Sequence, residues 1–348
     1  MENKSFIRIA PNSRIPKYRQ IVNSITEDVN HGKLDIGFRI PSINELSEHY
    51  YVSRDTVEKA YNILKKEGVI ESKKGRGYFI ANTLKVGYKR ILFLLNKFSD
   101  YKLKIYKAFL GEFGPEVKVD FYVYHCDQQL FINKVNESLG QYDYFIVMPH
   151  FKDDENYHQN CSDRVLETIR KIPLNKLIIM DNKLDQLGED VATVYQDFKM
   201  DIYHALTEAK EGLVKYEKLI LIFPDNSLYP HPQEIKFGFR KFCGEYKFDF
   251  EIIDSSEEEF EMQAGDAFIV VKENDLVNII SQVKANGLNL GVDLGVISYN
   301  DTPLKKFLGI TVITTDFEEM GKIAQKFISS NKRDQIKNNF TLINRGSI

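Results

Sequence analysis

The stretch from Pro41 to Ile80 constrains the fold of this chain most, because it predicts two short helices and a hairpin in close succession. Ser42, followed three residues later by Glu45, forms a capping box that starts a helix directly after Pro41. Ser53 can cap a second helix, whose apolar residues recur at helical spacing: Val57, Ala60, Tyr61 and Leu64. Two short helices across a tight turn predict a helix-turn-helix.

Two short strands are predicted after Gly68, at 69–72 and 78–80, around a basic turn that contains glycines. A cationic hairpin tip suits DNA phosphates or a narrow minor groove. In a helix-turn-helix the second helix enters the major groove, and its first residues meet the base edges. The predicted DNA-binding residues therefore lie at the two helix starts and on the hairpin: Ser42, Asn44, Ser53, Arg54, Asp55, Thr56, Lys73, Lys74, Arg76 and Gly77. A capped helix pair with a hairpin also occurs in proteins that never bind DNA.

Residues 15–81 resemble the winged helix of GntR-type bacterial transcription regulators. That pattern combines a Gly-x-Leu turn, Pro-Ser-x-x-x-Leu, Val-Ser-Arg-x-Thr-Val, Glu-Gly-x-Ile and a Gly-x-Gly wing. The chain matches it in order with Gly32-Lys33-Leu34, Pro41-Ser42, Leu46, Val52-Ser53-Arg54, Thr56-Val57, Glu67-Gly68-Val69-Ile70 and Gly75-Arg76-Gly77. The family usually has an arginine where this chain has Asn44, so its operator sequence cannot be carried over.

The charge of the chain is uneven. Residues 1–88 hold 15 Lys and Arg against 10 Asp and Glu, a net +5, whereas the whole chain has 47 against 50, which leaves −8 for the remainder. A basic head on an acidic body suits a DNA-binding domain attached to one that does not bind DNA. The three cysteines are widely separated and predict neither a disulfide framework nor a zinc site. With no signal peptide or membrane span predicted, we expect a cytoplasmic protein.

From Arg90 onward, short apolar runs alternate with stretches of helix length, which is typical of a parallel α/β sheet. The predicted strands are 91–95, 117–123, 144–148, 177–180, 219–223, 248–253, 267–271, 296–299 and 312–315. Nine strands exceed one small sheet, so we expect two Rossmann-like lobes with a ligand cleft at the carboxyl ends of their strands. The predicted domains are a winged helix at 1–82, a linker at 83–89 and a two-lobed domain at 90–348.

This second half resembles the sugar-sensing domain of LacI-type repressors, which is akin to periplasmic binding proteins. The resemblance rests on Gly265-Asp266-Ala267-Phe268-Ile269, on the run from Gly291 to Asp301, on Thr314-Thr315-Asp316 and on the closing Asn344-Arg345-Gly346-Ser347. It implies three crossovers between the lobes, near residues 200, 311 and 330. It also implies a small carbohydrate, such as a monosaccharide, as the effector.

Polar and aromatic side chains follow the predicted strands. Asn, Asp and Lys can bond to vicinal hydroxyl groups, and aromatic faces can cover the C–H patches of a sugar. The predicted effector-binding residues are Asn96, Lys97, Phe98, Tyr101, His150, Asp181, Asn182, Lys236, Asn274 and Asn300. The resemblance places a sugar contact at Asn300, whereas the family's second-lobe arginine is replaced by Ile235, beside Lys236. Asn and Asp also favour turns, so each could equally be a turn former.

Nucleophile, phosphate-binding and metal-binding motifs are missing from the sequence, which predicts a non-enzymatic protein without cofactor or metal. His150 and His158 lie in a polar stretch that suggests a surface loop, and His231 lies between two prolines. The prediction is a dimeric, ligand-responsive transcription regulator that binds a palindromic operator. The alternatives are a non-sugar effector (nucleoside, amino acid or sugar phosphate), a solute-binding protein of transport, and an enzyme-derived body such as an aminotransferase-like domain.

Overall fold

The computed structural model describes residues 7–10, 15–30, 33–81, 89–111, 113–114, 117–153, 155, 157–225, 227–254 and 262–348. The chain divides into two compact units, Met1–Tyr88 and Lys89–Ile348. The linker expected at 83–89 lies outside the described residues except for Lys89. In the described part of the chain, no helix has the length and apolar character that crossing a membrane requires.

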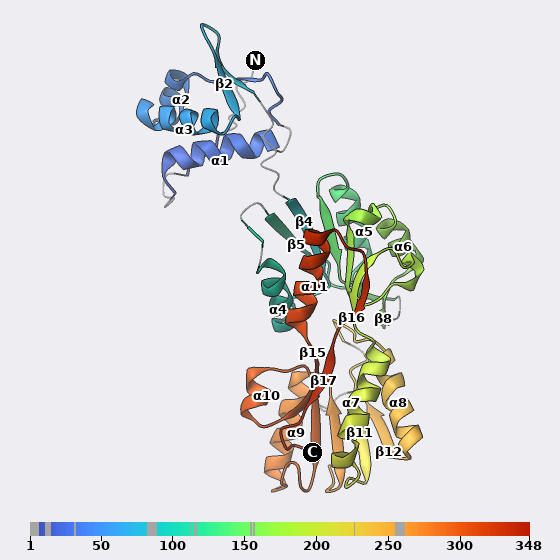
Figure 1. Ribbon diagram of the computed structural model, residues 1–348. Coiled ribbons are helices and arrows are strands. Elements are labelled where there is room, and N and C mark those ends of the chain that lie inside the picture. Colours follow the sequence, from blue (N-terminus) through green and yellow to red (C-terminus); the bar gives the residue numbers. More distant parts are fainter. Residues whose placement is uncertain are drawn as a thin grey trace. The chain divides into compact units, whose positions relative to one another are not determined.

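The first unit is a winged helix-turn-helix (Figure 1). Its elements are α1 (Lys17–Asn30), β1 (Arg39–Ile40), α2 (Ile43–Tyr50), α3 (Arg54–Lys66), β2 (Ile70–Lys73) and β3 (Gly77–Ile80). The strands pair antiparallel in the order β1-β3-β2. The apolar residues predicted on α3, such as Val57 and Leu64, are buried in one core together with Ile21 and Ile25 of α1.

The predicted capping box is present. The backbone N–H of Ser42 donates to Glu45 Oε2 at 2.6 Å, and the backbone N–H of Glu45 donates to Ser42 Oγ at 3.3 Å. Tyr51 ends α2 in the left-handed conformation, with φ at 51°. Ser53 then caps α3 by accepting the backbone N–H of Thr56 at 3.2 Å. These two caps place the start of α3 directly after a tight turn.

The first lobe of the second unit is a parallel sheet in the order β16-β10-β9-β6-β4-β5. Its strands are β4 (Lys89–Leu95), β5 (Val117–Val123), β6 (Tyr144–Val147), β9 (Leu177–Asp181), β10 (Ala192–Tyr195) and β16 (Gln335–Lys337). Helices α4 (Asp100–Leu110) and α11 (Phe317–Ser330) cover one face, and α5 (Gln128–Ser138) and α6 (Asp163–Ile169) cover the other. A short hairpin, β7 (Phe151–Lys152) and β8 (His158–Gln159), follows β6, and two single turns, η1 (Leu174–Lys176) and η2 (Asp185–Leu187), flank β9.

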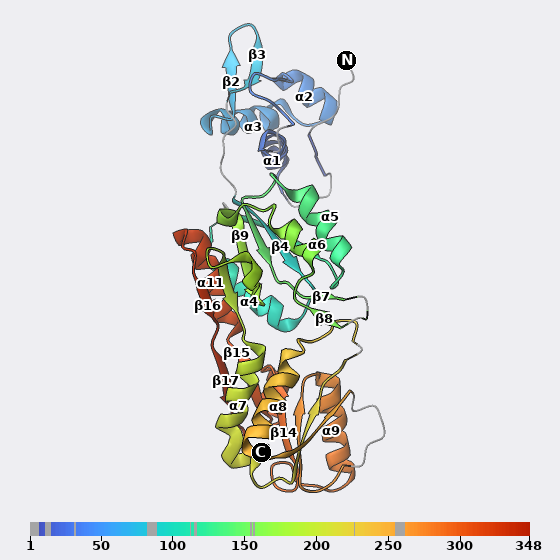
Figure 2. The same cartoon turned by 90° about the vertical axis from the view of Figure 1, so that its right-hand side faces the viewer.

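The second lobe is a sheet in the order β12-β11-β13-β14-β15-β17, whose last strand is antiparallel to its neighbour. Its strands are β11 (Lys218–Ile222), β12 (Asp249–Ile253), β13 (Asp266–Val270), β14 (Gly295–Tyr299), β15 (Thr311–Thr315) and β17 (Phe340–Ile343). Helices α7 (Phe198–Leu213) and α8 (Glu234–Tyr246) pack on one face, and α9 (Glu273–Ala285) packs on the other (Figure 2). The short α10 (Pro303–Phe307) joins β14 to β15.

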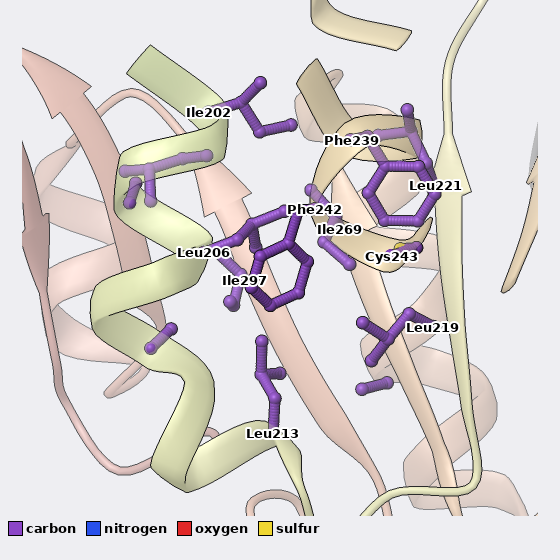
Figure 3. Close-up of a cluster of buried hydrophobic side chains, with 14 of the residues drawn as sticks. Ile202, Leu206, Leu213, Leu219, Leu221, Phe239, Phe242, Cys243, Ile269 and Ile297 are labelled. Atoms are coloured by element: carbon purple, nitrogen blue, oxygen red, sulfur yellow. The ribbon is translucent and has the colours of Figure 1, made fainter. Parts of the chain in front are cut away.

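The core of the second lobe explains why the sequences of its strands are continuous apolar runs. Strands buried on both faces need apolar side chains at successive positions rather than at alternating ones. Figure 3 shows Leu219 and Leu221 of β11 and Ile269 of β13 packed against α7 and α8, with Leu206 and Phe242 between the two helices and the sheet.

The sequence analysis did not predict β10, β16 or β17. Strand β16 contains a single apolar residue, Ile336, and lies at the edge of its sheet. Strand β10 has four residues, and β17 alternates apolar and hydroxyl side chains in part, so neither forms the long apolar run that marked the other strands. All three strands adjoin a crossover between the lobes.

The chain passes between the lobes at residues 196–197, at 316 and at 338–339. The crossovers expected from the sequence were near residues 200, 311 and 330. Asn338, whose exposed fraction is 1%, connects all three passages. Its backbone N–H donates to the Tyr195 carbonyl at 2.7 Å, and its Nδ2 donates to Thr315 Oγ1 and to the Asp316 carbonyl, both at 2.8 Å. The backbone and the buried side chain of Asn338 therefore join the three passages at the hinge.

Gly238 sets the distance between α7 and α8, because a Cβ at this position would lie 2.1 Å from the Lys199 carbonyl oxygen and 2.5 Å from Ile202 Cγ2. We expect Gly238→Ala to destabilise the second unit by roughly 1–3 kcal/mol through overpacking. The matched control is Gly244→Ala on the same helix, where a Cβ would meet nothing within 4 Å. Gly244→Ala should be neutral or stabilising by up to about 1 kcal/mol. Chemical denaturation measures both, and equal stability of the two variants would contradict the close approach at Gly238.

Candidate functional site

The side chains predicted to read DNA lie on the surface of the first unit. Arg54 and Asp55 open α3 and are exposed, Ser53 precedes them as the exposed cap, and Thr56 is half-buried. Ser53 Oγ and Thr56 Oγ1 lie 2.7 Å apart, so both hydroxyl groups are engaged in the cap. Arg54 therefore offers the strongest group for base contacts, because its guanidinium extends from the helix start and can bond guanine in two places.

The rest of the predicted DNA-binding surface lies on α2 and the hairpin. Asn44 is exposed in the first turn of α2, whereas Ser42 is half-buried and committed to the capping box. Lys74 and Arg76 are exposed at the hairpin tip, while Lys73 pairs with Glu71 at 3.0 Å. Gly77 has φ at 102°, which favours glycine, and it is half-buried. A shallow hollow runs along α3 and is lined by Asp55, Glu58, Lys59, Asn62, Ile63 and Lys66.

A buried polar network lies at the carboxyl ends of the first-lobe strands, and Asp181 is at its centre. Asp181 is the last residue of β9, has φ at 75° and is 4% exposed. Its Oδ2 lies 2.9 Å from His150 Nε2 and 3.7 Å from Lys102 Nζ, and its Oδ1 accepts Gln196 Nε2 at 2.5 Å. Burial acts to raise the pKa of this carboxyl, but His150, Lys102 and Gln196 together hold the pKa well below its usual range.

Lys102 brings a buried ammonium group to this network from α4. Its Nζ donates to Asn96 Oδ1 at 2.5 Å, and Asn96 Nδ2 lies 3.7 Å from Cys126 Sγ. Burial lowers the pKa of Lys102 to about 8, while Asp181 acts in the opposite direction. The sequence analysis found Asn96 and Asp181 but missed Lys102. Lys102 lies inside α4, whereas the predicted residues were those that follow the strands.

The prediction that His150 and His158 occupy a surface loop is wrong. His150 is 5% exposed, and its Nδ1 lies 2.8 Å from His158 Nε2 on β8. Asn182 Nδ2 approaches the same Nδ1 at 3.3 Å, and since an amide nitrogen only donates, His150 Nδ1 acts as the acceptor. His150 therefore donates through Nε2 to Asp181. Burial lowers the pKa of both histidines, which disfavours their protonated form.

Side chains from the second lobe face this network across the junction of the lobes. Tyr229 OH lies 2.9 Å from His125 Nδ1, and Lys97 Nζ lies 5.5 Å from the centre of the Tyr229 ring. Burial and the charges of Lys97 and Lys272 lower the pKa of His231 to about 3. We call this group the inter-lobe site: Lys97, Lys102, His150, His158 and Asp181 from the first lobe, with Tyr229, His231 and Lys272 from the second.

The remaining predicted effector residues are spread over both lobes. Phe98 is 68% exposed and lies beside Phe121, and Tyr101 stacks on Phe317 with ring centres 4.9 Å apart. Asn182 is buried and bonds to the Pro149 carbonyl at 3.0 Å. Of the second-lobe residues, Lys236 pairs with Asp225 at 2.5 Å, Asn274 is exposed on α9, and Asn300 is half-buried with φ at 63°.

The structure thus brings Asn96, Lys97, His150, Asp181 and Asn182 into one region, and it commits Lys236 to an ion pair with Asp225. Within the described residues, no group of three or more His, Cys, Asp and Glu is arranged to hold a metal ion. The hydrogen-bonding groups of the inter-lobe site suit reversible binding of a polar ligand.

Comparison with known proteins assigns both parts of the chain. Residues 17–80 match the family described as "Bacterial regulatory proteins, gntR family", and residues 214–347 match the "Periplasmic binding protein-like domain". The HTH-type transcriptional repressor YtrA of Bacillus subtilis (strain 168) is 38% identical over 79 residues, which are 23% of this chain and 61% of that protein. The repressor NagR of the same organism is 35% identical over 75 residues, 22% of this chain and 31% of that protein. The chain thus spans less than two thirds of these curated relatives.

Solved structures resemble the second unit in fold. The trehalose repressor from Escherichia coli superimposes with a TM-score of 0.57 at 13% identity, over 73% of this chain and 99% of that one. A LacI family regulator from Lactobacillus casei with bound glucose also gives 0.57 at 13% identity, over 74% and 99%. The chain therefore joins an N-terminal GntR-type helix-turn-helix domain to a two-lobed domain with the periplasmic-binding-protein-like fold of LacI-type regulators.

The three histidines with lowered pKa values predict a characteristic acid sensitivity. A histidine in the unfolded chain titrates near pH 6.5. As the pH falls below about 6.5, the unfolded chain therefore binds protons that His150, His158 and His231 do not bind in the folded state, and the folded state loses stability. Each of them should cost up to about 1.4 kcal/mol of stability per pH unit within this window.

The variant His158→Gln tests this prediction, because its amide can still donate to His150 Nδ1 while it cannot titrate. Its unfolding free energy, measured by urea denaturation between pH 7 and pH 5, should fall less steeply than that of the wild type, by about one proton. His204→Gln, at a site on α7 outside this cluster, serves as the control and should keep the wild-type slope. Parallel slopes for His158→Gln and wild type would show that His158 is protonated in the folded protein.

Proposed function

We propose that this protein is a ligand-responsive transcription regulator that binds a palindromic DNA operator as a homodimer. The observation that carries the proposal is the pairing of a GntR-type winged helix with a hinged two-lobed domain of the LacI type. The first unit supplies exposed groups for a DNA groove at Asn44, Arg54, Lys74 and Arg76. The second unit supplies a polar site between two lobes that can close around a small molecule.

The proposed effector is a small carbohydrate bound at the inter-lobe site. Asp181, Asn96 and Asn182 are the groups that hydroxyl-rich ligands require, and Tyr229 offers an aromatic face. The trehalose repressor and the glucose-bound regulator named above share the fold of the second unit, and this shared fold is what favours a sugar as the proposed effector. We expect the protein to act in the cytoplasm and to catalyse no reaction.

Effector binding changes operator affinity only to the extent that the ligand prefers one arrangement of the lobes over the other. The hinge passages converge at Asn338, so closure of the lobes would move the first and second sheets as two bodies around this residue. In a dimer, such a movement would alter the spacing of the two DNA-binding heads, and with it the match to half-sites about one helical turn apart.

Arg54 provides the test of the DNA-binding proposal. A preferred operator is first selected from random duplexes with the purified full chain. Arg54→Ala should then weaken binding to that operator by roughly 1–3 kcal/mol and relax the preference at one base pair, because a bidentate base contact is lost.

Lys65→Ala is the matched control, because Lys65 is exposed on α3 about 16 Å along the helix from Arg54 at 1.5 Å per residue. It should leave the base preference unchanged. Titration of labelled duplexes at fixed salt measures both variants. An Arg54→Ala protein with unaltered operator affinity and base preference would refute the assignment of Arg54.

A further inference from the structure

Arg39 is an exposed cation between the helix-turn-helix and the hairpin, and the sequence analysis did not include it among the DNA-binding residues. It forms the short strand β1 with Ile40, whose side chain is buried. In the sheet, Arg39 pairs with Phe79 of β3. Ser42, the cap of α2, follows three residues later. Arg39 therefore lies beside the hairpin on one side and close in sequence to the start of α2 on the other.

The side chain of Arg39 extends along the hairpin. A Cβ built on Gly77 would lie 3.5 Å from Arg39 Nε and 3.9 Å from Arg39 Nη2. Gly77 pairs with Lys73 across the hairpin and directly follows its tip, where Lys74 and Arg76 are exposed. Both views show the hairpin of β2 and β3 extending beyond α2 and α3 (Figures 1 and 2). The guanidinium group of Arg39 thus lies at the base of a basic, projecting hairpin.

Tyr61 of α3 fixes the position of Arg39 relative to the second helix of the helix-turn-helix. The Tyr61 hydroxyl donates to the Pro41 carbonyl at 2.6 Å, and the Tyr61 ring packs edge-on against Tyr78 with ring centres 4.8 Å apart. Tyr78 in turn pairs with Ile40 in the sheet. Tyr61 is 1% exposed. One buried side chain therefore joins α3, the segment that contains Arg39 and the hairpin, so these elements present their exposed groups at fixed relative positions.

The guanidinium group of Arg39 is available for an external partner. In the part of the chain that the structure describes, no carboxylate lies within 4.0 Å of it, whereas Lys73 pairs with Glu71 at 3.0 Å. The carboxylate of Glu45, at the start of α2, accepts the backbone N–H of Ser42 at 2.6 Å. The charged residues of β1, the hairpin and the first turn of α2 are four cations and two acids, a net +2: Arg39, Lys73, Lys74, Arg76, Glu45 and Glu71.

We propose that Arg39 binds a phosphate group of the operator strand that runs between the two grooves. The start of α3 enters the major groove, the hairpin tip suits a neighbouring narrow minor groove, and the DNA backbone separates the two. Arg39 lies between these elements, and a guanidinium group can bond two oxygens of one phosphate. Such a contact fixes the position of the head on the duplex but reads no sequence. The inference rests on the proposed function, since it adds a contact to the same DNA-binding surface.

Arg39→Gln in the full chain tests the inference, with the selected operator and an unrelated duplex of equal length as probes. We expect weaker binding to both duplexes by the same factor, roughly tenfold, because a charged hydrogen bond to the backbone is lost. The plot of log affinity against log salt concentration should become shallower by about 0.9, the value for one phosphate contact. Arg39→Lys should keep the wild-type slope and lose part of the affinity, because an ammonium group lacks the planar fork.

Lys65→Gln is the matched control, because it removes the same charge from an exposed position near the C-terminal end of α3. It should bind both duplexes like the wild type. Two results would overturn the inference: Arg39→Gln binding both duplexes as tightly as Lys65→Gln does, or Arg39→Gln losing affinity for the operator alone, which would make Arg39 a base-reading residue. If Arg39→Gln is unstable, Arg39→Lys decides, since unchanged affinity for both duplexes would exclude the two-point contact.

The inference and the proposed function fail in different ways. A wild type that binds the operator, with Arg54→Ala losing base preference and Arg39→Gln binding normally, would remove the phosphate contact and leave the regulatory function in place. A wild type that binds neither duplex would remove both.

Discussion

The arrangement of the two lobes depends on Asn338, which connects the three passages of the chain between the lobes. With a single buried side chain and its own N–H, it bonds the first passage at Tyr195 and the second at Thr315 and Asp316, while lying on the third. Its backbone and side-chain donors thus bond the two other passages, and losing either partner would leave a buried donor unsatisfied. Asn338 therefore fixes the spacing of the three passages at the hinge.

The buried charge of Asp181 is attached to this hinge through the neighbouring residue of the first passage. Gln196 directly follows Tyr195, whose carbonyl accepts from Asn338, and the Gln196 side chain donates to Asp181. Because a buried carboxylate is stable only when its partners remain in place, the positions of His150, Lys102 and Gln196 are linked energetically. A ligand that alters any one of these bonds at the inter-lobe site acts on the residue beside the hinge, which gives the site a physical route to the arrangement of the lobes.

The elements that could be predicted from the sequence are those that follow a local sequence pattern. The caps at Ser42 and Ser53 and the apolar runs of the central strands are local patterns, and the structure contains them. The edge strand β16 and the histidine pair were not predictable, because their environment comes from distant segments. His158 lies in a polar stretch of sequence, but the hairpin half-buries it and brings it to His150. Similarly, Lys102 appears as an ordinary helix residue until α4 places it beside Asp181.

The contacts across the junction of the lobes show where a ligand acts on their arrangement. Tyr229 belongs to the second lobe, and its hydroxyl group lies 2.9 Å from His125 Nδ1, while Lys97 of the first lobe lies over its ring. The free energy available to shift the lobes equals the difference in ligand affinity between the open and closed states. A ligand that contacts Tyr229 together with groups of the first lobe gains affinity in the closed state, because an open site offers it the partners of only one lobe at a time.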